Sequence, residues 1–336
     1  MSLIKNKYFG VGFTLLILVI GFIFGKMEKV KTTIAEDLNS VKNERDGDIR
    51  NEWAFISPLL DCAEIGNVSN KTINEMKAKV IDFIDQQKSQ GVYDAAIYFR
   101  DLNNGPWFGI KEKEKFLPAS LLKVPLMLSL LKQAVGDGTL LNSRFIWQGE
   151  SRNIEYFKAE KELQSNQEYT VDEALTYMIK YSDNNASNAL SYIVSTDTLL
   201  ASYEDLGIPL SNNTDYAISA RTYSSFFRIL YNSTFLNKEY SEKALRLLSE
   251  TMFNKGLVAG VSSSTIKISH KFGERQIVTT GAKQLHDCGI IYYPNKPYLL
   301  CVMTRGADFD KLASFISQVS SIVYNEVDKG RGIINN

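Results

Sequence analysis

The sequence has few of the residues that build metal sites and disulfide frameworks. Its 336 residues include only two histidines and three cysteines, and Cys62, Cys288 and Cys301 show no C-x-x-C spacing. These numbers leave little material for a metal site, and no metal or other cofactor is expected. Cys288 and Cys301 flank a predicted hairpin, but the sequence cannot fix the register that a disulfide needs. We favour the interpretation that the cysteines are small core residues.

The chain also lacks an excess of charge of either sign. Its 38 basic residues balance its 38 acidic residues, so the formal net charge is zero. A nucleic-acid partner would require a basic patch or stripe and is not expected. A hydrophobic content of 44% is enough for a substantial core.

One long hydrophobic run is present, close to the N-terminus. Residues 8–25 carry no charge, and as a helix they would span about 27 Å, just enough to cross a bilayer. Lysines on both sides leave the orientation open. A cleaved signal peptide is the alternative, but the run exceeds a usual signal-peptide core and no small-x-small cleavage site follows it. We therefore expect an uncleaved membrane anchor over residues 8–25 and a charged juxtamembrane spacer over residues 26–64.

Strand-like and helical patterns alternate along the rest of the chain. Helices are expected over residues 73–90, 121–134, 171–180, 186–194, 198–206, 221–231, 241–253 and 312–323. Strands are expected over residues 92–102, 107–110, 276–280, 289–293 and 298–304. Early and late strands around a helical middle predict an α+β fold with two lobes, and a site between lobes would suit a ligand.

The most informative motif is a serine and a lysine three residues apart. Ser120 and Lys123 lie at the start of an apolar segment that is expected to be helical. On a helix, residues i and i+3 are neighbours, so the Lys123 amine can reach the Ser120 oxygen. Serine needs a base to become a nucleophile, and a lysine serves only where burial or nearby cations lower its pKa. Alone, this spacing is common in helices and carries little weight.

Two further motifs follow in the order that this chemistry requires. They are Ser182-Asp183-Asn184 and Lys271-Phe272-Gly273. By itself, the first is more typical of a helix cap or turn. Together with Ser120 and Lys123, the ordered set matches the S-x-x-K, S-D-N and K-T-G signature of class A β-lactamases and penicillin-binding proteins, apart from Phe272.

From about Ile73 to Val327, the chain resembles the class A β-lactamase-like superfamily of penicillin-binding serine hydrolases. The resemblance rests on the three motifs and on the order of the expected elements. It implies an α+β fold in which an antiparallel sheet flanked by helices joins an all-helical lobe. The resemblance also implies that the catalytic domain, expected over residues 65–330, is extracytoplasmic and that residues 1–7 form a short cytoplasmic end.

The resemblance assigns roles to the motif residues. Ser120 would attack a carbonyl carbon and form an acyl-enzyme, and Lys123 would take or relay its proton. Ser182 would pass a proton to the leaving nitrogen, and Asn184 would hold Lys123 and the substrate amide. Lys271 would add positive charge near Ser182, which favours proton transfer and attracts an anionic substrate.

The third motif supplies backbone groups and carries the first departure from the family. The backbone N–H groups of Ser120 and Glu274 correspond to the family's oxyanion hole. Phe272 and Gly273 fall at substrate-binding positions, but Phe272 stands where the family has a hydroxyl that binds the substrate carboxylate. The loss of this hydrogen bond disfavours ordinary penicillins.

The second departure concerns release of the acyl group. Class A enzymes use a loop glutamate to activate the deacylating water, whereas the corresponding residues 207–220 contain no glutamate. Asp215 is the only carboxylate of this loop, and a helix cap or ion pair is its more usual role. Deacylation is therefore expected to be slow.

Three functions from different classes are compatible with these features. The leading one is a membrane-anchored serine hydrolase or acyltransferase that acts on a β-lactam or on an amide or ester related to cell-wall peptide. The second is a true β-lactamase that uses Asp215 or another group for deacylation. The third is a non-catalytic module of the same fold, which would not need the complete set of motif residues.

Overall fold

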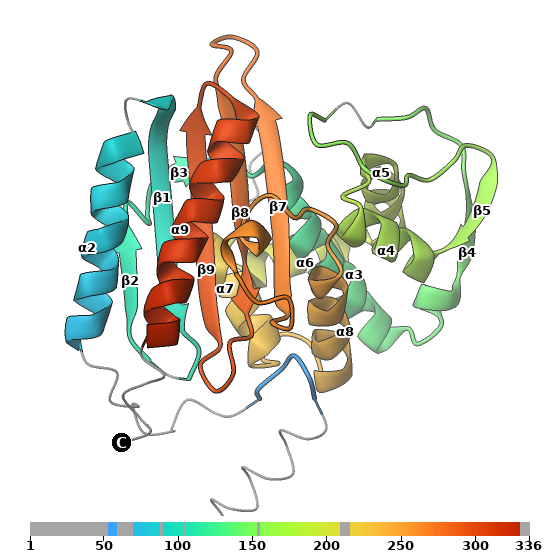
Figure 1. Cartoon of the computed structure of the whole chain (residues 1–336). Coiled ribbons are helices and arrows are strands. Elements are labelled where there is room, and N and C mark those ends of the chain that lie inside the picture. The colour runs from blue at the N-terminus through green and yellow to red at the C-terminus, as the bar shows by residue number, and fades with distance from the viewer. Residues whose placement is uncertain are drawn as a thin grey trace, which may run out of the picture. The chain divides into compact units, whose positions relative to one another are not determined.

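A five-stranded antiparallel sheet is assembled from two distant parts of the sequence (Figure 1). Its order is β2-β1-β9-β8-β7. The strands are β1 (Val92–Asp101), β2 (Trp107–Ile110), β7 (Ile268–Gln276), β8 (Lys283–Ile291) and β9 (Tyr298–Gly306). The expected turns after β1 and after β8 are both present, and the α+β architecture with an antiparallel sheet is confirmed.

The computed structural model describes residues 53–58, 70–87, 90–103, 105–152, 155–208 and 216–329. The expected membrane anchor over residues 8–25 lies outside these residues, as do Cys62 and Asp215. From Phe55 onward the chain forms one unit.

The strand that carries the third motif differs from its expected bounds. Residues 276–280 were expected to form a strand after the motif, but β7 contains Lys271 to Gly273 and ends at Gln276. Ile277 accepts the N–H groups of Thr280 and Gly281 in the connecting turn to β8. The β-branched residues of this segment favour a strand, but they lie in the turn, where the Val278 side chain is 94% exposed.

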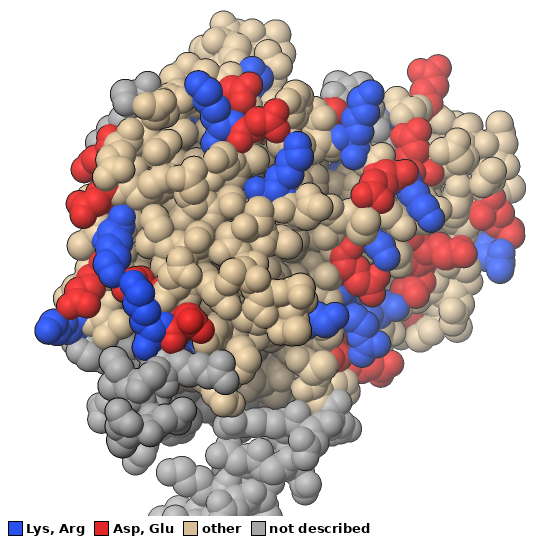
Figure 2. All heavy atoms as spheres, in the orientation of Figure 1, with Lys and Arg blue, Asp and Glu red and all other residues tan. Residues whose placement is uncertain are grey.

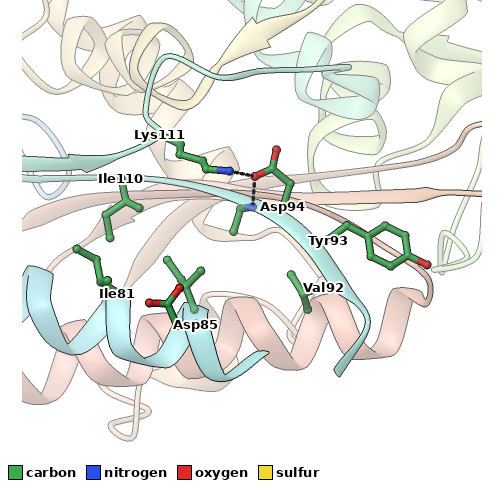
Figure 3. A pocket seen from close by; sticks show the side chains of 9 residues that line it. Ile81, Asp85, Val92, Tyr93, Asp94, Ile110 and Lys111 are labelled. Atoms are coloured by element: carbon green, nitrogen blue, oxygen red, sulfur yellow. Dashed lines mark hydrogen bonds and ion pairs between the residues drawn. The ribbon is translucent and has the colours of Figure 1, made fainter. Parts of the chain in front are cut away.

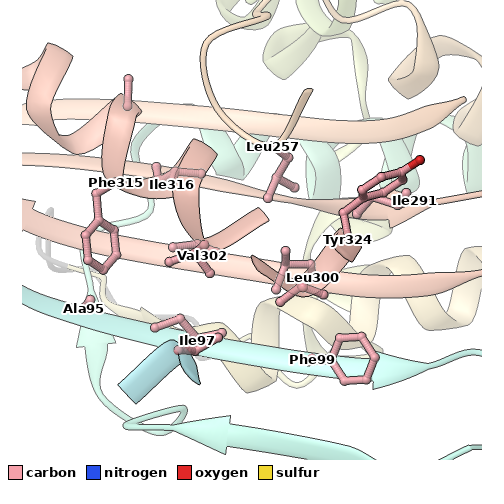
Figure 4. Packing of buried hydrophobic residues seen from close by; sticks show 14 of the residues in the cluster. Ala95, Ile97, Phe99, Leu257, Ile291, Leu300, Val302, Phe315, Ile316 and Tyr324 are labelled. Carbon is pink, nitrogen blue, oxygen red and sulfur yellow. The ribbon is translucent and has the colours of Figure 1, made fainter. Parts of the chain in front are cut away.

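Helices cover the sheet on both faces. The helices α2 (Asn70–Gln87) and α9 (Phe309–Lys329) pack together on one face, and α7 (Ala220–Tyr231) packs on the other. Figure 4 shows the core between α9 and the sheet, where Phe315 and Ile316 lie against Val302 of β9. This layer consists of buried apolar side chains, and its close packing makes the sheet a firm support for the motif on β7.

The helical lobe is built around the helix that follows Ser120. Its elements are η2 (Ala119–Leu122), α3 (Lys123–Gly136), α4 (Val171–Lys180), α5 (Asn184–Ile193), α6 (Thr196–Asp205) and α8 (Lys238–Ser249), with the hairpin of β4 (Arg144–Trp147) and β5 (Gln167–Thr170). Among the described residues, one helical segment, Ala119–Gly136, is long and apolar enough to cross a membrane, and it is mostly buried in this lobe. Its apolar residues are those of a core helix.

Two short elements complete the described part of the fold near Ser120. The strands β3 (Lys115–Phe116) and β6 (Ile218–Ser219) pair just before η2.

Figure 2 shows positive and negative side chains interspersed on the face covered by α2 and α9. A broad area without charged side chains lies between groups of mixed charges, so neither positive nor negative potential dominates this face.

The cysteine interpretation is corrected by the sheet register. Cys288 of β8 lies directly opposite Cys301 of β9, and the two form a disulfide with their Cα atoms 3.9 Å apart. The sequence alone could not decide this pairing, because a shift of one residue would have placed the two side chains on opposite faces.

Candidate active site

Ser120 lies on a tight turn in front of the core helix. Residues Ala119–Leu122 form the 3₁₀ turn η2, which continues directly into α3 at Lys123. Ala119 has a positive φ of 48°, a conformation that costs energy for a residue with a side chain. Ser120 remains half-buried, and the Lys123 amine lies 2.9 Å from its Oγ. The predicted proximity of the two side chains is therefore present.

Lys123 lies in a buried ring of acceptors. Its Nζ lies 2.6 Å from the Ser182 carbonyl oxygen and 2.6 Å from Oδ1 of Asn184. Burial lowers the pKa of Lys123 to about 8, although the nearby carboxylates of Glu155 and Asp183 favour the charged form. A neutral amine has two N–H groups, which the carbonyl and amide oxygens can accept. Its lone pair is then available to the Ser120 hydroxyl.

The Ser182-Asp183-Asn184 motif is both a helix cap and part of the site. Asp183 caps α5 by accepting the N–H groups of Asn185 and Ala186. Ser182 has a positive φ of 59°, and this turn brings its carbonyl and hydroxyl to Lys123. The alternative cap interpretation is thus correct for Asp183, while Ser182 and Asn184 contact Lys123.

Lys271 approaches the same hydroxyl from β7. Its Nζ lies 2.8 Å from Ser182 Oγ and donates also to the Phe272 carbonyl. Lys271 is fully buried, and burial, with the charge of Lys123, lowers its pKa well below the ordinary value. We expected Lys271 to attract anionic substrates by its charge. Burial weakens this positive charge, and the amine lies within hydrogen-bond distance of Ser182 Oγ. Its role in attracting the substrate stays a prediction.

Gly273 allows β7 to approach the turn that carries Ser120. A Cβ atom at Gly273 would lie 2.7 Å from the Pro118 carbonyl oxygen and 2.9 Å from the Leu121 nitrogen. Only a glycine permits this contact between backbone segments. The N–H groups of Ser120 and Glu274, the expected oxyanion donors, therefore belong to segments that pack directly against each other.

The ring of Phe272 packs among other aromatic side chains. Its ring is 6% exposed and stacks on Phe253 with a centroid distance of 4.2 Å. Phe157 contacts the same pair edge-on. These three rings line a cavity of about 280 Å³, together with Tyr181, the residue before Ser182. The aromatic side chain at this position forms a wall of the cavity and offers no hydroxyl to a carboxylate.

Comparison with known proteins identifies the family to which these motifs belong. The model of the beta-lactamase enzyme family matches residues 75–327. The chain belongs to the beta-lactamase enzyme family. Among curated proteins, none matches the sequence.

Solved structures share the fold of this beta-lactamase family member at low sequence identity. PBP-A is 21% identical over 76% of this chain and 97% of its own, with a TM-score of 0.63. A beta-lactamase from Chitinophaga pinensis is 18% identical over 76% of this chain and 100% of its own, with a TM-score of 0.65. A class A beta-lactamase from Bacteroides cellulosilyticus is 19% identical over 76% and 99%, with a TM-score of 0.62.

Two glutamates complete the site of this beta-lactamase family member, and sequence reasoning gave neither side chain a role. The carboxylate of Glu155 accepts a hydrogen bond from the Asn184 amide. Glu274 accepts the Phe157 N–H at 2.8 Å, and burial raises the pKa of its carboxyl to about 7. Glu155 belongs to no motif, and only the fold brings it to the site. The expectation for Glu274 concerned its backbone N–H alone.

A second cavity, of about 240 Å³, lies away from the motif residues between α2 and the first two strands (Figure 3). Ile81, Val92 and Ile110 form its apolar lining, and the Lys111 ammonium pairs with Asp94 at its edge. It contains no nucleophile or base of the expected chemistry. Within the described residues, no cluster of histidine, cysteine, aspartate or glutamate side chains could hold a metal ion.

Proposed function

We propose that this protein is a membrane-anchored serine hydrolase or acyltransferase that forms an acyl-enzyme at Ser120. The observation that carries the proposal is the continuous set of contacts from Ser120 through Lys123 to Ser182 and Lys271. The acyl donor is a β-lactam or an amide or ester of the cell-wall-peptide type. A variant of PBP-A has been solved as an acyl-enzyme complex with penicillin G, which supports the acylation chemistry for this fold.

Acylation begins with proton transfer from Ser120 to Lys123. The lowered pKa gives Lys123 a sizeable neutral fraction near neutral pH, and its Nζ lies within hydrogen-bond reach of Ser120 Oγ. As the proton moves to Nζ, Oγ bonds to the substrate carbonyl carbon. The N–H groups of Ser120 and Glu274 would then stabilise the charge on the carbonyl oxygen.

Breakdown of the tetrahedral intermediate requires a proton at the leaving atom. Ser182 Oγ lies 3.3 Å from Lys123 Nζ and 2.8 Å from Lys271 Nζ. The proton can therefore pass from Lys123 to the Ser182 oxygen while the Ser182 proton moves to the leaving nitrogen or oxygen. The bond from the carbonyl carbon to that atom breaks, and the acyl group stays on Ser120 as an ester.

Release of the acyl group needs a water molecule and a base. Residues 207–220 contain no glutamate, and Asp215 lies outside the described residues. The proposal is therefore an acyl-enzyme that hydrolyses slowly or passes its acyl group to an amine acceptor. The proposed location rests on the apolar run over residues 8–25, which favours an anchor, and on the family resemblance, which implies an extracytoplasmic catalytic unit.

The test is mass spectrometry of the intact full-length protein, purified in mild detergent, after incubation with an activated neutral thioester or with benzylpenicillin. We expect the neutral thioester to add one acyl group that is absent from Ser120→Ala and persists for minutes after excess donor is removed. Glu75→Gln, which changes an exposed residue of α2, serves as the matched control and should label like the wild type.

Other outcomes select the alternatives. Rapid hydrolysis of a chromogenic cephalosporin, lost in Ser120→Ala, would identify a true β-lactamase with another deacylation base. No Ser120-dependent adduct with any acyl donor would contradict the proposal and favour a binding module. The positive φ values at Ala119 and Ser182 argue against that module, because strained residues beside a nucleophile are typical of catalytic sites.

A further inference from the structure

Two carboxylates face the catalytic lysines without forming ion pairs. Lys123 directs its amine to Ser120, Ser182 and Asn184, and Lys271 directs its amine to Ser182 and the Phe272 carbonyl. Neither lysine donates to Glu155 or Glu274, and the described residues provide no ion pair for these two glutamates. Neither carboxyl group therefore has a local counter-ion, and in its absence burial favours the protonated form of Glu274.

Glu274 holds a buried acceptor that has no partner. Its side chain is only 8% exposed, and Oε1 accepts the Phe157 N–H. Oε2 is buried and has no hydrogen-bond partner among the described residues. A buried carboxylate oxygen without a donor costs free energy, so this position favours a ligand that brings a donor or a positive charge.

Glu155 belongs to the same cluster of charged and polar side chains. It bonds to the Asn184 amide, and its charge acts on Lys123, Lys271 and Glu274. The segment 155–157 thus reaches from Asn184 of the helical lobe to Glu274 of β7. A carboxylate of the substrate placed here would meet two carboxyl groups, and Phe272 would offer it no hydroxyl.

We infer that Glu155 and Glu274 form a recognition site for a protonated amine on the substrate, in the place where a penicillin would carry a carboxylate. The inference rests on the proposed function, and it names the substrate class as acyl compounds with a basic nitrogen close to the scissile bond. An ammonium beside the Glu274 carboxyl would supply the donor that its enclosed oxygen lacks and would favour its charged form, while the charge of Glu155 supports the ammonium. Both are specificity residues, and the bond-making steps at Ser120 are unchanged.

Three thioesters of N-acetylglycine that differ only in the leaving thiol test this inference. Dimethylaminoethanethiol carries a protonated amine, isopentanethiol is its neutral isostere, and mercaptopropionate carries a carboxylate. Release of thiol by the full-length protein is measured against Ser120→Ala. We expect kcat/KM to be at least about tenfold higher for the amine than for the neutral thioester, mainly through KM, and lowest for the carboxylate.

Glutamine variants locate the preference. In Glu274→Gln and Glu155→Gln the ratio of kcat/KM between the amine and neutral thioesters should fall toward one, because the amide keeps the shape and removes the charge. Glu75→Gln removes one exposed charge on α2 and should keep the wild-type ratio. Turnover of the neutral thioester within each variant shows that the protein is folded.

The two failures are distinguishable. Ser120-dependent release from the neutral thioester without a preference for the amine overturns this inference and leaves the proposed function intact. A preference that survives both glutamine substitutions also overturns it. Absence of Ser120-dependent release from all three thioesters overturns the proposed function and this inference with it.

Discussion

Lys123 links the pH dependence of acylation to the burial of a single amine. The protonated form cannot accept the Ser120 proton, and the pKa of Lys123 is lowered to about 8. The acylation rate should therefore rise with pH and level off above about pH 8, as the neutral form becomes dominant. The measurement is kcat/KM for the neutral thioester between pH 6 and 10.

Substitution by arginine separates the charge of Lys123 from its role as a base. A guanidinium stays protonated throughout this pH range, so Lys123→Arg should lower acylation by about a hundredfold or more. Lys132→Arg, at an exposed lysine of the same helix, should remain within twofold of the wild type. A pH profile that is flat, or that survives Lys123→Arg, would show that another group takes the proton.

The sequence predicted the residues whose role is set by local spacing. Ser120 and Lys123 meet because they are three residues apart on consecutive helical turns, and this contact was expected. Glu155 could not be predicted in the same way, because its partner Asn184 is 29 residues away. Its position depends on how the segment between two motifs folds back, which no motif or periodicity records.

At the scale of elements, the contact between β7 and η2 controls the position of Ser120. Gly273→Ala would place a methyl group against the Pro118 carbonyl and the Leu121 nitrogen, so the strand or the turn must move. We expect a loss of stability of about 1–3 kcal/mol. A displaced nucleophile should also lower acylation by about a hundredfold. Thermal unfolding and thioester kinetics measure the two effects.

Gly138→Ala is the matched control for this substitution. A Cβ atom at Gly138 would meet no atom within 4 Å, so stability and acylation should stay close to those of the wild type. Wild-type acylation in Gly273→Ala would contradict the role given to this contact. The strand itself was misplaced by the sequence, because the β-branched residues 277–280 favour a strand locally while the register of β8 ends β7 at Gln276.

For the whole molecule, the sequence predicts the order of helices and strands, but it does not predict which residues face each other across the sheet. Early and late strands around a helical middle indicated the α+β fold, and the sheet does join β1 to β9. The Cys288–Cys301 disulfide and the partners of His286 required the register between strands that the sequence does not encode locally. The contacts of His286 with distant parts of the chain also determine how the free energy of unfolding depends on pH.

The stability of this fold should depend on pH through a buried histidine. His286 Nε2 lies 3.0 Å from the Leu117 carbonyl, to which it donates, and Nδ1 accepts the Thr304 N–H. If Nδ1 were protonated, its N–H would face the Thr304 N–H and both groups would be donors. Burial lowers the pKa of His286 to about 4. Between pH 4 and 6.5 the unfolded chain therefore binds more protons, and the contribution of His286 to stability rises with pH by up to about 3 kcal/mol.

A difference measurement isolates this contribution from that of Glu274. The pKa of Glu274 is raised to about 7, so the folded state binds its proton more tightly and its contribution falls as pH rises through the same window. The free energy of unfolding of the wild type thus combines two opposing slopes. His286→Gln keeps one donor and one acceptor and removes only the upward slope. Its stability should fall relative to the wild type between pH 4.5 and 6.5, and parallel curves in urea unfolding would show that His286 does not titrate on unfolding.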